Sequence, residues 1–340
     1  MTVPTLGMAT GSESILSAEL GAAAAAAATE LGVNVRRVAT VADARGVDVV
    51  LGIGYPVHYP ALNDETVEGS RVAWLGEPLP PLDEPLADRV LRLVPMGRVL
   101  DASIAVAAFA NRGRRPARLG RWREAAAYAY DRRYNVREHS RAFATGIKLV
   151  VTSADQAASL ARRGIPARVL PFGYHRSIAG DPVSPSTGDR DIDLLVLGTA
   201  TTGVPTRRAR ITRDTLAGLD AAVRVVVVED GLWGATRTAM LRRARIVLNV
   251  HRVPGNYTGI RTMLAAAAGA LIVSEPVAAP SPFVAGTHYV EADEANLATA
   301  VHEHLASQPR RVALAEACQA LVLEQITMRA SMERLLGSPQ

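Results

Sequence analysis

Short apolar runs alternate with longer amphipathic segments along most of the chain. In the first half, the alanine-rich residues 14–31 predict a helix, because alanine has the highest helix propensity. Ser153 and the Gly164-Ile-Pro166 stop signal delimit a second helix over residues 153–163. β-Branched runs bounded by turn residues predict strands at 33–38, 47–53, 72–75, 148–152 and 167–170. Residues 122–143 predict a basic helix.

The alternation is more regular in the second half. Strands are predicted at residues 193–197, 223–228, 246–250 and 271–274, with 223–228 buried on both faces. Helices are predicted at residues 206–219, 236–243, 259–268, 295–305 and 310–323, followed by a closing segment at 325–336. Strands that alternate with helices of ~10–15 residues indicate parallel βαβ units.

A Ser-, Pro-, Gly- and Asp-rich stretch over residues 177–190 separates the two halves and predicts a linker. The sequence thus predicts an α/β fold with two Rossmann-like, doubly wound domains, residues 1–175 and 191–325, that face a central cleft. Residues 326–340 are expected to form a C-terminal helix that crosses back to the first domain. Ligands of open parallel sheets bind beyond the carboxyl ends of the strands, so the loops after those ends are where we expect the site.

Composition sets limits on location. No apolar stretch reaches the ~18–20 residues of a membrane span. The alanine run at residues 22–28 follows a segment without basic residues, which favours a helix over the alternative of a signal peptide. Cys318 is the single cysteine, which excludes an intramolecular disulfide or a cysteine-based metal cluster and predicts a cytoplasmic protein.

The net charge is +5, and Lys148 is the only lysine, so arginine carries almost all the positive charge. Ten arginines lie between Arg112 and Arg141, against three acidic residues. Such a block predicts either a solvated helical face or a surface for an anionic acceptor, nucleic acid or a membrane.

The stretch from Arg243 to Pro276 carries a family resemblance. Its strand reads Ile246-Val-Leu-Asn249-Val-His251, and Arg261 then opens a helix with a small-residue run that ends at Gly269. Together with Leu170-Pro-Phe-Gly-Tyr174 and the segment from Gln325 to Glu333, it resembles the C-terminal domain of GT-B-fold glycosyltransferases. The spore-maturation-protein-like group is the most similar.

The resemblance implies a nucleoside-diphosphate-sugar donor and no cofactor. Retaining members of this fold commonly have two glutamates near this helix, where this chain has Asn256 and Leu264. This departure puts the usual ribose contact in doubt, and Glu275 is a possible substitute for it.

Several residues at predicted strand ends are candidates for holding the donor. A diphosphate suits backbone N–H groups at a helix N-terminus and neighbouring cations, as at the start of the helix near Gly259 and Arg261. Trp233 is a candidate to stack on the base, against the alternative of a core position. The expected donor-binding set is Gly198, Thr199, Arg207, Trp233, Asn249, His251, Tyr257, Thr258, Gly259, Arg261 and Glu275.

Two residues in the first half are candidates for the catalytic base. His58 and Glu77 each follow a predicted strand beside Gly and Pro, and each has the proton-accepting chemistry that an inverting transferase needs. Ordinary loop stabilisation is the alternative for both.

The sequence therefore predicts a metal-independent glycosyltransferase that uses a nucleotide-sugar donor and holds an unidentified acceptor on residues 1–170. Three alternatives stay open: a non-catalytic glycan- or partner-binding protein, a nucleotide-sugar epimerase, and a transferase for an anionic acceptor such as nucleic acid.

Overall fold

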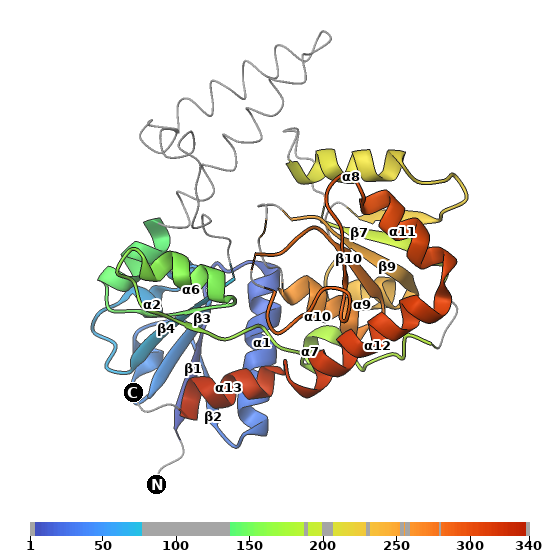
Figure 1. Cartoon of the computed structure of the whole chain (residues 1–340). Helices are drawn as coiled ribbons and strands as arrows, with labels where there is room; N and C mark the ends of the chain where they lie inside the picture. Colours follow the sequence, from blue (N-terminus) through green and yellow to red (C-terminus); the bar gives the residue numbers. More distant parts are fainter. Residues whose placement is uncertain are drawn as a thin grey trace, which may run out of the picture.

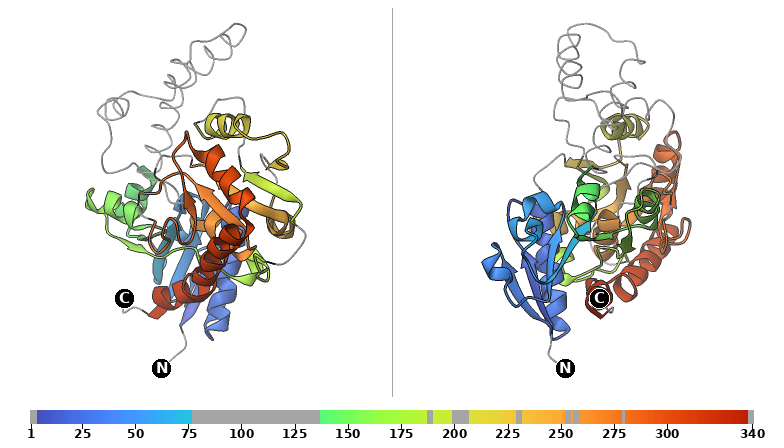
Figure 2. Two further views of the ribbon diagram at one scale, coloured as in Figure 1. Left: turned by 45° about the vertical axis from the view of Figure 1, so that its right-hand side comes forward. Right: turned by 90° about the vertical axis from the view of Figure 1, so that its left-hand side faces the viewer.

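The computed structural model describes residues 4–76, 137–186, 190–198, 207–228, 232–251, 255, 259–278 and 280–337. Two parallel sheets lie side by side, each flanked by helices (Figures 1 and 2). The predicted α/β architecture with two doubly wound sheets is confirmed.

The first sheet has six strands in the order β2-β1-β3-β4-β5-β6, all parallel. Its strands are β1 (Thr5–Ala9), β2 (Asn34–Val38), β3 (Val49–Ile53), β4 (Ser70–Leu75), β5 (Lys148–Val151) and β6 (Ala167–Val169). The helices of this half that lie wholly within the described residues are α1 (Ile15–Glu30), η1 (Ala42–Ala44), η2 (Pro56–His58), α2 (Pro60–Asn63), α6 (Ala154–Ala161) and α7 (Arg176–Ala179). Ser14 caps α1, and Ser153 forms a capping box with Gln156 at the start of α6, so both helices begin where the sequence predicts.

The second sheet has five parallel strands in the order β11-β10-β9-β7-β8. Its strands are β7 (Ile192–Leu197), β8 (Val225–Val228), β9 (Ala244–Asn249), β10 (Leu271–Ser274) and β11 (Val290–Glu291). The helices are α8 (Arg207–Ala217), α9 (Gly234–Arg243), α10 (Gly259–Ala267), α11 (Leu297–Ala306), α12 (Gln308–Glu324) and α13 (Met328–Gly337).

Both sheets reverse their strand order at one place. In the first sheet, β2 lies on one side of β1, whereas β3 and the strands after it lie on the other side. In the second sheet, β8 lies on one side of β7, whereas β9 and the strands after it lie on the other side. Such a switch point opens a crevice at the carboxyl ends of the two strands, where ligands of this architecture bind. The topology therefore selects two loop pairs: those after β1 and β3, and those after β7 and β9.

One hydrophobic cluster is shared by the two sheets. It contains the buried alanines of α1, one face of each sheet, and apolar side chains of α10, α12 and α13. Two further clusters each cover the remaining face of a single sheet. Helix α13 packs against α1, so the end of the chain lies on the first half of the molecule (Figure 1).

The chain crosses between the two halves at two adjacent places. Tyr174 pairs with Thr327 in a parallel bridge; its N–H donates to Ile326 O at 2.7 Å and its carbonyl accepts from Met328 N–H at 2.8 Å. A Cβ on Gly173 would lie 2.2 Å from the carbonyl carbon of Thr327, so only glycine fits at this crossing.

Four details differ from the sequence prediction. The strands β1 and β11 were not predicted, because β1 is a five-residue run with a central glycine and β11 has two residues. Strand β8 is half-exposed rather than buried on both faces, since it pairs only with β7 at the sheet edge. The predicted linker begins with the end of α7.

Two further features bear on the compositional predictions. No helix in the described part of the chain is long and apolar enough to cross a membrane. Cys318 is a buried free cysteine on α12, and its burial raises the pKa of the thiol to about 12. Most of the Arg112–Arg141 block lies outside the described residues.

Candidate functional site

The switch point of the second sheet brings together three charged or polar residues from separate segments of the chain. Arg207 is the first residue of α8, His251 follows β9, and Glu275 follows β10. The Arg207 guanidinium donates from Nη1 to Glu275 Oε2 at 3.1 Å and to the His251 carbonyl at 3.1 Å, and from Nη2 to Glu275 Oε1. This two-pronged ion pair fixes the guanidinium across the mouth of the switch point.

Glu275 acts as the centre of this arrangement. Its side chain is buried, and Oε2 also accepts the backbone N–H of His251 at 2.8 Å. Both carboxylate oxygens are therefore occupied by Arg207 and the β9 loop. Its position favours holding Arg207 in place over contacting a ribose.

His251 is fully buried beside this carboxylate. Its Nε2 lies 3.2 Å from the Glu275 carbonyl and 3.2 Å from Ser274 Oγ, so Nε2 carries the proton that the carbonyl accepts. Burial lowers the pKa of His251 to about 4, with the charges of Arg261 and Arg207 adding to that effect and Glu275 opposing it. The ring is therefore neutral at pH 7. Its Nδ1 is an acceptor that has no partner in the described part of the chain.

Asn249 and Arg261 form a second pair at the same strand end. Arg261, in the first turn of α10, donates to Asn249 Oδ1 at 2.7 Å, while Asn249 Nδ2 donates to Ser274 Oγ at 3.1 Å. Burial, together with the nearby charge of Arg208, lowers the pKa of Arg261. The buried Asn249 thus orients a cation at the N-terminus of a helix.

The surroundings carry an excess of positive charge. Arg207, Arg208 and Arg210 stand on the first turn of α8, and Arg261 adds a fourth cation. The described carboxylates that pair with them are Glu275, Glu294 and Asp214. Glu294 is bonded to Arg210 and lies 4.0 Å from Arg207, and Asp214 lies 3.8 Å from Arg210. Four guanidinium groups against three carboxylates leave an excess of positive charge that suits an anionic ligand, and α10 begins beside them.

The other predicted donor residues have varied positions. Gly198 follows β7 with a φ of +70°, in the conformation that favours glycine, and α10 begins at Gly259 as predicted. Trp233 directly precedes α9 and is half-buried. Thr199, Tyr257, Thr258 and the catalytic candidate Glu77 lie outside the described residues.

The switch point of the first sheet contains His58. Its Nδ1 lies 3.3 Å from Ser12 Oγ, and its carbonyl accepts the Ser12 N–H at 3.0 Å. A Cβ on Gly11 would lie 1.8 Å from that carbonyl oxygen, so glycine is required where the two loops meet. The Gly11-Ser12-Glu13 loop was not predicted, because β1 was not predicted. A Gly-Ser-Glu run between an apolar strand and a capped helix was the available signal.

A buried ion pair joins the two halves beside these loops. Glu19, in the second turn of α1, accepts from Arg237 Nη1 at 2.7 Å and from the Gly234 N–H at 2.7 Å. Arg237 also donates to the Ile178 carbonyl at 3.1 Å. Since α1 starts beyond β1 and α9 beyond β8, this contact brings the carboxyl-end regions of the two sheets toward each other.

Acidification is expected to destabilise the fold through His251. An unfolded histidine has a pKa of ~6.5, so protons bind the unfolded chain first, and stability present above pH 6.5 is lost progressively toward pH 4. Between pH 7 and pH 5 the loss from this group is roughly 2 kcal/mol. Denaturant unfolding at both pH values measures it, and His251→Gln should lose less stability than the wild type over this interval. His302→Gln, at a partly exposed position, is the matched control; equal losses in wild type and His251→Gln would contradict the assignment.

Comparison with known proteins places these features in a family context. Residues 195–337 match the glycosyl transferase-like family. The chain has no significant sequence match among curated proteins. The matched segment contains Arg207, Asn249, His251, Arg261 and Glu275. It agrees with the predicted glycosyltransferase resemblance and gives no separate support to the spore-maturation-protein-like group.

Solved structures of glycosyltransferases are similar over the whole chain. HepE from Anabaena in complex with UDP-glucose is 11% identical, with 99% of each chain covered and a TM-score of 0.56. WaaG, a glycosyltransferase involved in lipopolysaccharide biosynthesis, is 12% identical, with 98% of this chain and 100% of WaaG covered and a TM-score of 0.51. TarM is 10% identical over 85% of this chain at a TM-score of 0.52, and the match spans 54% of TarM. These likenesses confirm the predicted GT-B fold.

Proposed function

We propose that this chain, with the GT-B fold and a glycosyl transferase-like segment at residues 195–337, transfers a sugar from a nucleoside-diphosphate donor to an acceptor. The observation that carries the proposal is the cluster of Arg207 and Arg261 at the switch point of the second sheet, oriented by Glu275 and Asn249. In this proposal, the domain of residues 191–325 holds the donor and the domain of residues 1–175 holds the acceptor.

The donor diphosphate would lie between the start of α10 and the arginines of α8. Arg207 and Arg261 neutralise charge that develops on the leaving diphosphate as the sugar departs, and backbone N–H groups near Gly259 donate to its oxygens. Because these groups are cationic, we propose that transfer needs no metal ion. Gly198 and Thr199 would lie along the donor, with Tyr257 and Thr258 before α10.

Two neutral groups would orient the rest of the donor. The neutral His251 offers Nδ1 as an acceptor for a hydroxyl group, and Trp233, at the start of α9, offers a ring face to the base. On the acceptor side, His58 and Glu77 are the proposed general bases, with Ser12 orienting the His58 ring. The buried free Cys318 fits a reducing compartment such as the cytoplasm.

The test is a binding panel of UDP, GDP, dTDP and ADP and their sugars, with and without Mg²⁺. UDP-glucose is the first choice because the similar HepE was solved with it. A ligand that binds only the native state raises the unfolding midpoint. A shift with one base and its sugar, independent of Mg²⁺, supports the proposal; no shift with any nucleotide would move the assignment to a non-catalytic binding protein.

Substituting Arg261 should weaken nucleotide binding specifically. Arg261→Ala is expected to cost about 1.5–3 kcal/mol of nucleoside-diphosphate affinity, the scale of one charge-assisted hydrogen bond. Titration calorimetry measures it. The exposed Arg310→Ala on α12 is the control for loss of one positive charge, and Arg261→Lys retains the charge without the two-pronged geometry. Unchanged affinity in a folded Arg261→Ala protein would remove Arg261 from the site.

A further inference from the structure

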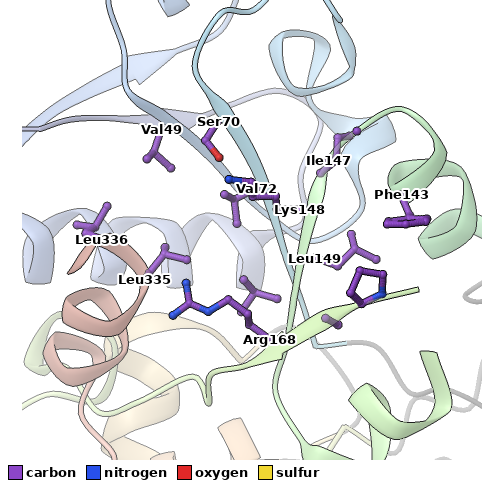
Figure 3. Close-up of a pocket in the computed structure, with 14 residues that line it drawn as sticks. Val49, Ser70, Val72, Phe143, Ile147, Lys148, Leu149, Arg168, Leu335 and Leu336 are labelled. Atoms are coloured by element: carbon purple, nitrogen blue, oxygen red, sulfur yellow. The ribbon is translucent and has the colours of Figure 1, made fainter. Parts of the chain in front are cut away.

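A cavity of about 400 Å³ lies at the amino ends of the strands of the first sheet (Figure 3). The first residues of β3, β4, β5 and β6 line it, together with the last turn of α13. The strands pair in parallel there, Val49 with Ser70 and Val72 with Lys148. The proposed transfer site lies at the carboxyl ends of strands, so this cavity is separate from it.

The walls of the cavity are mainly apolar. Val49 and Val72 of the sheet face Leu335 and Leu336 of α13 across it (Figure 3). Phe143 lines the same space with an exposed ring. An apolar cavity of this size with a small number of polar groups is typical of small-molecule sites.

The polar groups of the cavity are cationic or neutral. Lys148 and Arg168 supply two positive charges and Ser70 a hydroxyl, while no aspartate or glutamate is among the described residues that line the cavity. The Lys148 side chain is exposed and forms no ion pair or hydrogen bond within the part of the chain that the structure describes. It is also the only lysine of a chain that otherwise uses arginine. The guanidinium of Arg168 is fixed at the mouth by donating to the Arg334 carbonyl at 2.6 Å.

We propose that this cavity binds a free anionic amphiphile, a single apolar chain that ends in a carboxylate. The carboxylate pairs with the Lys148 ammonium within the positive field of Arg168, and the chain lies against Val49, Val72, Leu335 and Leu336. Both ends of such a ligand match the cavity: charge at the two cations and an apolar body at the aliphatic walls.

Occupancy would join two parts of the fold. The ligand contacts strand ends of the first sheet and the last turn of α13, the helix that starts directly after the crossing at Thr327. It therefore holds α13 against the sheet. Binding is expected to stabilise the native chain, whichever donor the transfer site takes.

The experiment titrates the full chain with dodecanoate below its micelle concentration, using dodecyltrimethylammonium as a probe with the same tail and opposite charge. Expected results are one dodecanoate per chain, a raised unfolding midpoint, and no binding of the cationic probe. Lys148→Met and Leu336→Asp should each weaken dodecanoate binding at least tenfold. Arg162→Ala, which removes an exposed arginine at the end of α6, should leave it unchanged.

The single lysine permits a second measurement on the unmodified protein. Acylation of Lys148 by an amine-reactive reagent, followed by peptide mass spectrometry, should slow when dodecanoate is bound. The proposal is overturned if dodecanoate does not bind or leaves Lys148 unprotected, or if both chain-length-matched probes bind equally. Binding only to anionic vesicles would assign a membrane surface instead, and a dimer that Leu336→Asp dissociates would assign a second copy of the chain.

Discussion

Glu275→Ala is expected to lower the free energy of unfolding by about 3–5 kcal/mol, the cost of breaking a buried ion pair from one side. The carboxylate is buried and holds both Arg207 and the His251 N–H, so its removal leaves a guanidinium and a backbone donor without their acceptor. The rate of sugar transfer should also fall, because Arg207 would lose the orientation in which it is proposed to bind the diphosphate.

Four variants separate the effect on stability from the effect on transfer. Denaturant unfolding gives the stability of Glu275→Ala, Arg207→Ala and the double variant. Because the two residues contact each other, the double variant should lose less unfolding free energy than the two single variants lose in total. Glu275→Gln retains an acceptor of the same shape, so it should fold better than Glu275→Ala and still bind donor weakly. Additive losses in the cycle would show that the ion pair does not exist as described.

Arg237→Ala is expected to have an effect of similar size on stability. Arg237 is buried and joins Glu19 of α1 to the Ile178 carbonyl, and its loss leaves a half-buried carboxylate between the two halves. We expect a loss of about 3–5 kcal/mol. The contact spans the interface, so the two halves should also unfold less cooperatively, which separate probes in each sheet can detect.

The matched control removes an arginine from a comparable pair at the surface. Arg176 lies 3.9 Å from Glu30 with an exposed side chain, so Arg176→Ala should cost less than about 1 kcal/mol. Glu19→Ala, Arg237→Ala and the double variant together form a double-mutant cycle that measures the coupling energy of this ion pair. If Arg237→Ala destabilised no more than Arg176→Ala, the interface contact would not contribute as argued.

The sequence predicted elements where local pattern decides them. The capped helix α1 and the apolar β9 and β10 are such cases, because their apolar periods and flanking turn residues are local. Strand β1 lacks that signal: it is buried on one side by contact with Val38 and Val47, which come within 2.6 and 2.9 Å of where a Gly7 Cβ would be. This central strand has no alternation of apolar and polar residues and a single β-branched residue, Thr5.

For the candidate site, the sequence predicted which residues lie near the strand ends but not the contacts among them. Asn249, His251, Arg261 and Glu275 were expected near strand ends, and they do lie there. The bonds among them depend on strand order: Arg207 and Glu275 are 68 positions apart and meet only because β7, β9 and β10 are neighbours in the sheet. For the same reason the contacts of Glu275, whose oxygens receive Arg207 and the His251 N–H, could not be read from the sequence.

The paired crossing at Tyr174 and Thr327 determines how the molecule is able to move. Two covalent connections that lie hydrogen-bonded side by side share a single pivot, so a rotation of one half must twist both peptides about nearly the same line. Sliding and wide separation of the halves are constrained, while a swing about that line is permitted. A chain shortened to end before Thr327 would keep both sheets on one tether and acquire torsional freedom that the intact protein lacks.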